Sequence, residues 1–248
     1  MEQFNLILFS TLIAKTTQNN ILKHRFYNKS KSEQNKIQSV IVLSALAIKL
    51  LSIFLSWKTG IYLIAIFTFP IVLSLIASFI DTPSMKKSGR LIYYSPLFIT
   101  EKPKNDIITI HGGTLFDYVF VINKKMTGKQ STDFIIQQYL EGLLSMIETY
   151  EDTKNSDLRI CGTSYIINQR TAERIGLKIV KTDYFQKMIL LYNYFNIFIS
   201  NSIAKNKIAF PNLNKTKTFE TDLKTLIEHK VYIAQLNQKL ESSIAKKV

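Results

Sequence analysis

Two long apolar runs dominate the hydrophobic pattern of the first part of the chain. Ile37–Trp57 and Ile61–Ile80 each have about the length that crosses a hydrocarbon core of roughly 30 Å as a helix. Only residues 58–60 separate the two runs, so a tight turn must return the chain to the side from which it came. The pattern therefore predicts an antiparallel transmembrane hairpin over residues 37–81.

Cations flank the predicted hairpin at one end. In residues 1–36, a basic N-terminal segment, Lys and Arg outnumber the acidic residues, and three more cations lie in 82–90, whose Pro, Ser and Gly favour a linker. The turn contains only Lys58. Because positive charge favours the cytoplasmic side, we expect a multi-pass protein of the cell membrane with both termini in the cytoplasm.

Lys49 is the one charged residue inside the first apolar run, and neither run contains an acidic residue to pair with it. An unpaired cation at the centre of a membrane helix costs about 2.5 to 3.5 kcal/mol on insertion scales. Snorkelling to the interface, contact with a second subunit or a lipid headgroup, and a transport role are the interpretations open to it.

After the linker, short β-branched and aromatic runs alternate with amphipathic ones. This predicts a cytosolic mixed α/β domain over 91–230 and a C-terminal helix or tail over 231–248. Strands are expected at 91–94, 106–111, 115–122, 158–161, 164–167 and 177–180, and helices at 131–150, 169–175, 184–204 and 219–229. The fold class is thus a membrane-anchored α/β protein, with a two-helix hairpin followed by the cytosolic domain.

Two of these elements carry more specific expectations. Gly112–Gly113 lies between the strands at 106–111 and 115–122, which predicts a β-hairpin. The helix at 184–204 is apolar nearly all round, so something must cover it. We expect it to be buried against the sheet, and a position along the bilayer surface is the alternative.

Composition and charge narrow the class of partner. The chain has 248 residues, 46% hydrophobic and 20% charged, which excludes a largely disordered protein. Its net charge of +14 is spread along the whole length without a dense basic stripe, so nucleic acid is not an expected partner. The expected partners are the lipid bilayer and a protein partner or a second copy of the chain. Cys161 is the single cysteine, and no intramolecular disulfide can form.

The segment around the two glycines contains the residue types that carry chemistry. His111 and Asp117 are candidate catalytic residues, as a base or ligand and its acidic partner. Gly112, Gly113 and Arg170 are candidate binding residues, because backbone amides at paired glycines can approach an anion. The purely structural interpretations of these residues are a turn at the glycines, a structural histidine and an outward-facing aspartate. A thiol-hydrolase arrangement of Cys161 with the same two residues needs the fold to bring them together.

The sequence offers no ligand spacing for a metal and no phosphate-binding glycine motif, so neither a metal nor a cofactor is expected. The run from Asn168 to Lys178 resembles, over about a dozen residues, the end of the acyl-CoA N-acetyltransferase domain, where an Asn and an Ala lie on a helix before a Gly-aromatic pair. Here Ala172 and Gly176 are spaced too closely, and Leu177 replaces the aromatic residue. A helix, a glycine cap and a strand explain the same residues.

These patterns predict an integral membrane protein whose cytosolic domain is a tethered interaction or regulatory module. The alternative is a membrane-associated transferase or hydrolase that acts on a lipid-linked or acyl substrate. An enzyme predicts that His111, Asp117 and also Glu141 or Arg170 converge on one pocket, whereas a binding module predicts that they are scattered.

Overall fold

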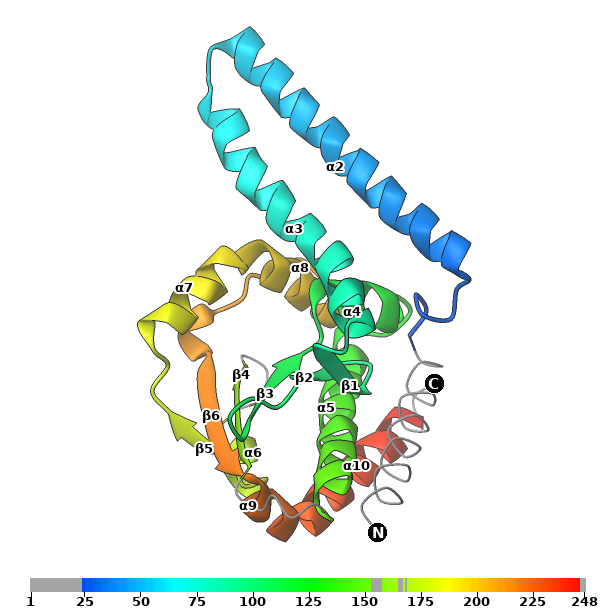
Figure 1. Ribbon diagram of the computed structural model, residues 1–248, viewed down its shortest axis with the longest axis vertical. Helices are drawn as coiled ribbons and strands as arrows, with labels where there is room; N and C mark the ends of the chain where they lie inside the picture. Colours follow the sequence, from blue (N-terminus) through cyan, green and yellow to red (C-terminus); the bar gives the residue numbers. More distant parts are fainter. Residues whose placement is uncertain (1–23, 153–157, 165–166, 168, 246–248) are drawn as a thin grey trace.

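A pair of long helices projects from an α/β domain in the computed structural model (Figure 1). The structure describes residues 24–152, 158–164, 167 and 169–245. Most of the predicted basic N-terminal segment therefore lies outside the described residues. The expected order of a helical hairpin followed by a mixed α/β domain is confirmed.

The hairpin consists of α2 (Lys31–Thr59) and α3 (Leu63–Lys87). Ser30 starts α2 with a capping box, because its hydroxyl accepts from the Glu33 amide while the Glu33 carboxylate accepts from Ser30. Gly60 ends it with a φ of 71°, which a residue without Cβ adopts at little cost. Both helices are long and apolar enough to cross a membrane.

Helix α3 continues well past the predicted end of the second apolar run. It passes through Pro83 to Lys87, so most of the stretch expected to be a linker is helical, and only Ser88, Gly89 and Arg90 separate α3 from the sheet. A proline inside a helix leaves the carbonyl four residues earlier without its usual donor. The Gln38 side chain of α2 donates to that carbonyl, on Phe79, at 3.2 Å.

The contact between α2 and α3 is made by small and hydroxyl-bearing residues. Ala45, Ser52 and Ser56 are the buried residues of α2, all on one face of the helix, and the Ser56 hydroxyl accepts from the Ala65 amide at 3.0 Å. Small residues allow helix backbones to approach closely, as is typical of membrane helices. Lys49 places its ammonium 4.0 Å from the centre of the Phe69 ring on α3, which gives it a cation–π partner inside the hairpin.

The domain is built on a six-stranded sheet in the order β1-β2-β3-β4-β6-β5. Its strands are β1 (Leu91–Ser95), β2 (Phe98–Glu101), β3 (Ile107–Gly112), β4 (Arg159–Ser164), β5 (Lys178–Val180) and β6 (Lys217–Asp222). Only β3 and β4 pair in parallel; the other neighbours are antiparallel. Strands β2 and β6 were not expected; β4 covers most of the strand predicted at 158–161 and extends to Ser164, whereas residues 165–166 of the strand predicted at 164–167 lie outside the described residues.

The expected β-hairpin around Gly112–Gly113 is wrong. Residues Leu115–Val121 form helix α4, and α5 (Gly128–Tyr150) follows it, so the chain crosses over from β3 to the parallel strand β4. The signal for the helix is the pair Thr114 and Asp117, which forms a capping box at its start. The local capping bonds outweigh the β-branched and aromatic composition that favoured a strand.

The core lies between the sheet and α5, with the C-terminal helix α10 (Lys230–Ala245) packed beside it. Short helices α6 (Gln169–Arg174) and α9 (Leu223–Glu228) flank strands β5 and β6. Helix α6, the glycine at 176 with a φ of 84° and strand β5 match the helix, cap and strand interpretation of that run. Asn168, part of the acetyltransferase resemblance, lies outside the described residues.

The long helix expected at 184–204 is two helices, α7 (Tyr184–Tyr192) and α8 (Tyr194–Lys205), divided at Asn193. The prediction that it is buried against the sheet is wrong for α7, which has no buried residue. Helix α8 packs against α3, α4 and α5, and its buried residues are Asn196, Ser200, Asn201 and Ala204. Phe195, at the start of α8, is 40% exposed.

Candidate functional site

A cleft of about 380 Å³ lies between the sheet and the base of the helical hairpin. It is bounded by α3, by the ends of β3 and β4, and by the start of α8. Because β3 and β4 are parallel, their carboxyl ends meet at the same edge, and crevices at such edges are where α/β sheets commonly bind ligands. The cleft is therefore the candidate functional site of the described structure.

Gly112 and Gly113 line this cleft for a reason that differs from the predicted turn. A Cβ on Gly112 would lie 1.7 Å from the Tyr139 hydroxyl oxygen, and one on Gly113 would lie 2.6 Å from the Leu97 side chain. Neither glycine has a positive φ. The pair therefore lets α5 and the β1–β2 connection approach the end of β3 closely.

His111 stands at the same edge and pairs with Glu101 on the neighbouring strand. Its Nε2 lies 2.9 Å from the Glu101 carboxylate, and the two side chains are 44% and 53% exposed. A solvent-exposed pair of this kind stabilises the fold by at most about 1 kcal/mol. Its clearer effect is to orient the imidazole beside the cleft.

The remaining walls are rich in neutral hydrogen-bonding groups. The residues include Ser78 and Thr82 of α3, Thr163 and Ser164 of β4, and Asn196 and Ser200 of α8. None of the described residues that line the cleft is Lys or Arg. The chemistry suits a ligand or peptide that offers neutral donors and acceptors better than it suits a phosphate.

Asn196 fixes the geometry of the cleft wall that adjoins the hairpin. Its amide nitrogen donates to the Ser74 carbonyl at 3.1 Å and to the Ser74 hydroxyl at 2.8 Å, while the Ser78 hydroxyl donates to its oxygen at 2.9 Å. Buried polar groups satisfied in this way hold two elements in one arrangement. The cleft wall and the hairpin therefore form a connected unit.

Asp117 is the other predicted catalytic residue, and it does not line the cleft. It is fully buried at the start of α4. The Thr114 amide and hydroxyl donate to one carboxylate oxygen at 2.7 and 2.8 Å, and the Tyr93 hydroxyl donates to the other at 2.9 Å. His24 Nε2 lies 3.2 Å from that second oxygen. These contacts give Asp117 a structural setting apart from His111.

Lys86 completes a polar cluster around Asp117, together with Tyr27, Tyr93 and His24. Its ammonium lies 3.4 Å from the centre of the Tyr27 ring and 4.7 Å from that of Tyr93. Burial lowers the pKa of Lys86 to about 8, although the negative charge of Asp117 opposes the change. Burial first, and then the Asp117 charge, raise the pKa values of both tyrosines. The cluster joins residues 24–29, the end of α3, β1 and α4.

The other candidates are scattered. Arg170 is exposed on α6 and lies outside the cleft. Glu141 on α5 accepts hydrogen bonds from Gln137 and Gln138. Cys161 Sγ lies 3.9 Å from the Thr109 hydroxyl across the β3–β4 pair. No group of three or more His, Cys, Asp or Glu side chains gathers as a metal site among the described residues.

Comparisons with protein-family models, with curated proteins and with solved structures give no match for this chain. Its function must therefore be inferred from its own geometry. Sequence reasoning placed His111, Gly112 and Gly113 at a site but missed Glu101 and Asn196. Asn196 had a signal, since an amide side chain interrupts an otherwise apolar helix.

Proposed function

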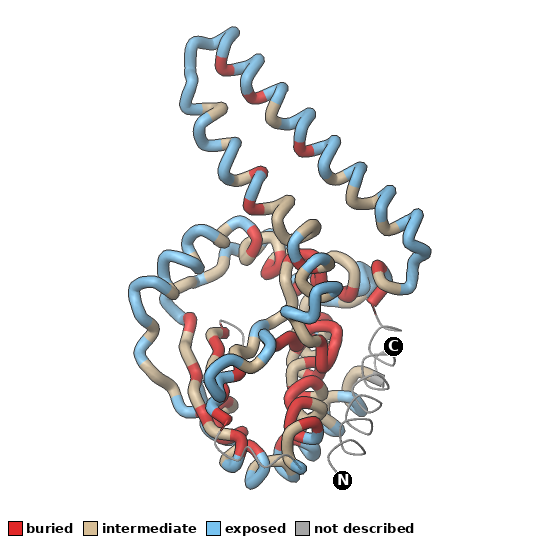
Figure 2. Tube along the Cα trace, viewed as in Figure 1, coloured by how far each residue is buried: buried red, intermediate tan, exposed pale blue. Residues whose placement is uncertain are grey.

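We propose that the hairpin of α2 and α3 crosses a lipid bilayer and holds the α/β domain against one membrane face. The observation that carries this proposal is the exposure of the hairpin's apolar side chains. Only 17% and 11% of the residues in the most apolar stretches of α2 and α3 are buried inside the molecule. Figure 2 shows α2 exposed along most of its length, and α3 as a mixture of exposed and partly buried residues with few buried ones.

A core helix of a soluble domain has the opposite arrangement. Leu43, Leu50 and Ile53 on α2 and Phe67 on α3 are each more than half exposed, whereas the buried residues of α2 are Ala and Ser. Each large apolar side chain left in water forgoes about 1.5 to 3 kcal/mol of burial energy. A bilayer supplies the apolar surroundings that the rest of the described chain does not.

The charge distribution supports an orientation with the domain in the cytoplasm. Lys29, Lys31 and Lys36 lie at the domain end of α2, and Lys86 and Lys87 lie at that end of α3. At the other end, Lys58 stands over Trp57, with its ammonium 5.1 Å from the ring centre. By the positive-inside rule, the domain end is cytoplasmic and the turn is on the far side.

Within this arrangement the domain serves as a tethered interaction or regulatory module, and the cleft receives its partner. The scatter of His111, Asp117, Glu141 and Arg170 supports binding over catalysis, since a catalytic site needs its groups in reach of one substrate atom. The lining combines neutral hydrogen-bonding groups with apolar side chains such as Ile99 and Ile197, which favours an uncharged partner. The partner meets the domain beside the membrane surface.

A photo-crosslinking residue at Thr163, inside the cleft, tests this part of the proposal. Expressed in full-length chain in cells, it should give discrete adducts of constant mass. The matched control carries the same residue at exposed Lys224 on α9. Identical adduct patterns from the two positions would contradict a specific binding role for the cleft.

The alternative function, a transferase or hydrolase acting on a lipid-linked or acyl substrate, is favoured by one observation. The Glu101 carboxylate orients His111 beside the cleft, which is the arrangement of a general base and its orienting group. Incubation of the purified full chain with a total membrane lipid extract, followed by mass spectrometry, distinguishes the two functions. A binding module leaves the extract unchanged, whereas product that forms with the wild type and not with His111→Gln would establish the enzyme.

A further inference from the structure

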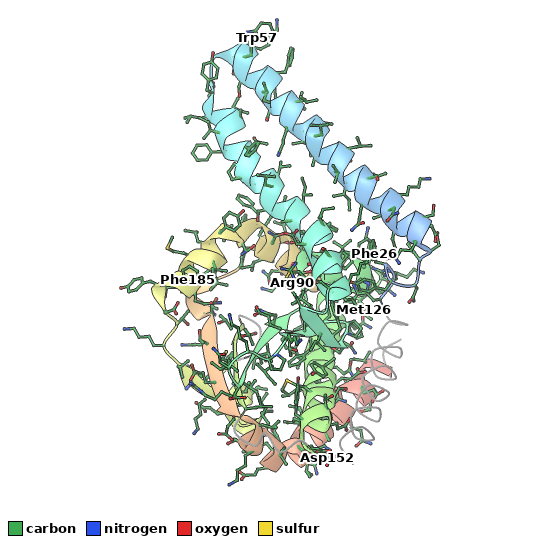
Figure 3. All side chains as sticks on the ribbon, viewed as in Figure 1. Phe26, Trp57, Arg90, Met126, Asp152 and Phe185 are labelled. Carbon is green, nitrogen blue, oxygen red and sulfur yellow. The ribbon has the colours of Figure 1, made fainter. Side chains whose placement is uncertain are left out.

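Helix α7 presents an apolar face that nothing in the described structure covers. Tyr184, Phe185, Met188, Leu191 and Tyr192 are between 64% and 83% exposed, and α7 has no buried residue. Their spacing places all five on one stripe of the helix, because successive residues turn by about 100°. Phe185 points away from the domain in Figure 3.

The opposite side of α7 faces the domain. Leu190 lines the cleft, and the Asp183 side chain caps the helix by accepting from the Gln186 amide at 2.6 Å. One side of α7 therefore faces the protein, and its aromatic side is directed outward. A soluble protein rarely leaves so many large aromatic and apolar residues together in water.

The position of α7 is fixed relative to the hairpin by α8. Asn196 of α8 bonds to Ser74 and Ser78 of α3, and α7 ends just before it, at Tyr192. Ser74 lies six residues before Ile80, the last residue of the predicted span, or about 9 Å along the helix axis at 1.5 Å per residue. The α7–α8 junction is thus level with the last turns of the apolar part of α3, on the side of the domain from which the hairpin leaves (Figure 1).

The positive charges around α7 are complementary to an anionic membrane surface. Lys181 precedes the helix, Lys187 lies on it, Lys205 ends α8 and Lys207 follows it, whereas Asp183 is the only acidic residue between 181 and 210. Lysines at the margin of an apolar helical face attract anionic headgroups. Phe210, 72% exposed, stacks on Phe198 of α8 with ring centres 4.9 Å apart and adds a further exposed aromatic surface beside α8.

We propose that α7 lies in the membrane–water interface, with its aromatic stripe inserted at the boundary between the headgroups and acyl chains of an anionic bilayer. The domain is then attached at two places, through the hairpin and through α7. This inference rests on the proposed function, because α7 reaches the bilayer only if the hairpin spans it. It also places the cleft, which Leu190 helps to line, at the level of the lipid headgroups.

Tryptophan fluorescence in anionic vesicles tests the inference, since the chain contains a single tryptophan, Trp57, at the tip of the hairpin (Figure 3). The double variant Trp57→Phe, Phe185→Trp places the probe on α7. The control, Trp57→Phe with Tyr232→Trp, places it near the start of α10, which begins beside α9 at the end of the domain away from the hairpin (Figure 1). Each full-length protein is reconstituted with and without lipids brominated close to the headgroup.

A tryptophan at 185 should emit at shorter wavelength than one at 232, lose most of its emission to brominated lipid and resist quenching by acrylamide. Quenching by acrylamide to the same extent as at 232 would overturn the inference. Resistance to acrylamide without quenching by brominated lipid would overturn it in favour of a protein partner on α7. The wild-type protein separates the two claims: if brominated lipid fails to quench Trp57, the hairpin proposal itself is wrong.

Discussion

At the scale of single residues, Asp117 shows how a buried carboxylate organises the region next to the hairpin. Burial of a charge is costly unless donors surround it, and Asp117 has the Thr114 amide, the Thr114 hydroxyl and the Tyr93 hydroxyl in that role. The same carboxylate caps α4 and lies against His24. Asp117 therefore links the segment before α2 to the domain.

Substitution of Asp117 by Asn should lower the free energy of unfolding by about 2 to 4 kcal/mol, because it leaves buried donors without a charged acceptor. Denaturant unfolding of the full chain in detergent measures the change. Glu101→Gln is the matched control, since it alters a half-exposed pair and should cost less than about 1 kcal/mol. Equal losses in the two variants would show that Asp117 contributes no more than a surface residue.

Lys86 predicts a specific pH dependence. The pKa of Lys86 is about 8 in the folded chain, whereas a lysine in the unfolded chain has its ordinary pKa of 10.5. Between these two pH values the unfolded chain therefore binds more protons than the folded chain. Stability must then rise with pH from about 8 towards 10. Ionisation of Tyr27 and Tyr93 in the unfolded chain acts in the opposite direction only near and above pH 10, because their folded pKa values are raised. The free energy of unfolding, measured between pH 8 and 9.5, should rise with pH in the wild type and should not rise in Lys86→Met. The same dependence on pH in both proteins would contradict a lowered pKa of Lys86.

At the scale of elements, the hairpin follows from the length of its two apolar runs, α5 from its amphipathic period, and β1, β3, β4 and β5 from short runs rich in β-branched and aromatic residues. Residues 115–122 show where the pattern fails. Their β-branched and aromatic side chains favour a strand, but the capping box at Thr114 and Asp117 starts a helix. That change turns Asp117 away from His111, so the composition of the candidate site could not be predicted without the correct element.

The division of residues 184–204 into α7 and α8 also could not be predicted from the hydrophobic pattern. Both halves are apolar, and what differs is their surroundings, since α8 packs against α3, α4 and α5 while α7 has no buried residue. Asn196 joins α8 to α3 by its hydrogen bonds to Ser74 and Ser78, residues more than a hundred positions away in sequence. Contacts over such separations carry no local signal.

Asn196→Ala should therefore loosen the attachment of α8 to α3. Removing a buried amide that makes three hydrogen bonds costs about 1 to 3 kcal/mol and leaves serine groups unpaired. Hydrogen exchange of the reconstituted protein should speed up in α8 and leave strands β3 and β4 unchanged. Asn214→Ala, at an exposed position, is the control. Unchanged exchange in α8 would show that the bonds to α3 do not hold it.

At the scale of the whole molecule, the helical hairpin and the α/β domain form two connected parts. The rest of the described chain leaves most of the hairpin's apolar surface uncovered, and the cleft and α7 lie on the side of the domain from which the hairpin leaves it. Binding at that cleft would occur next to the membrane. The hairpin's crossing of the bilayer is the claim on which the rest depends.

Single-cysteine labelling in intact cells tests that claim most directly. In a Cys161→Ser background, Thr59→Cys places a thiol at the exposed turn and Ser88→Cys places one at the exposed domain end of α3. A membrane-impermeant maleimide should label position 59 in intact cells and position 88 only after the membrane is opened. Equal labelling of both positions before lysis, or of neither until lysis, would contradict a hairpin that crosses the bilayer.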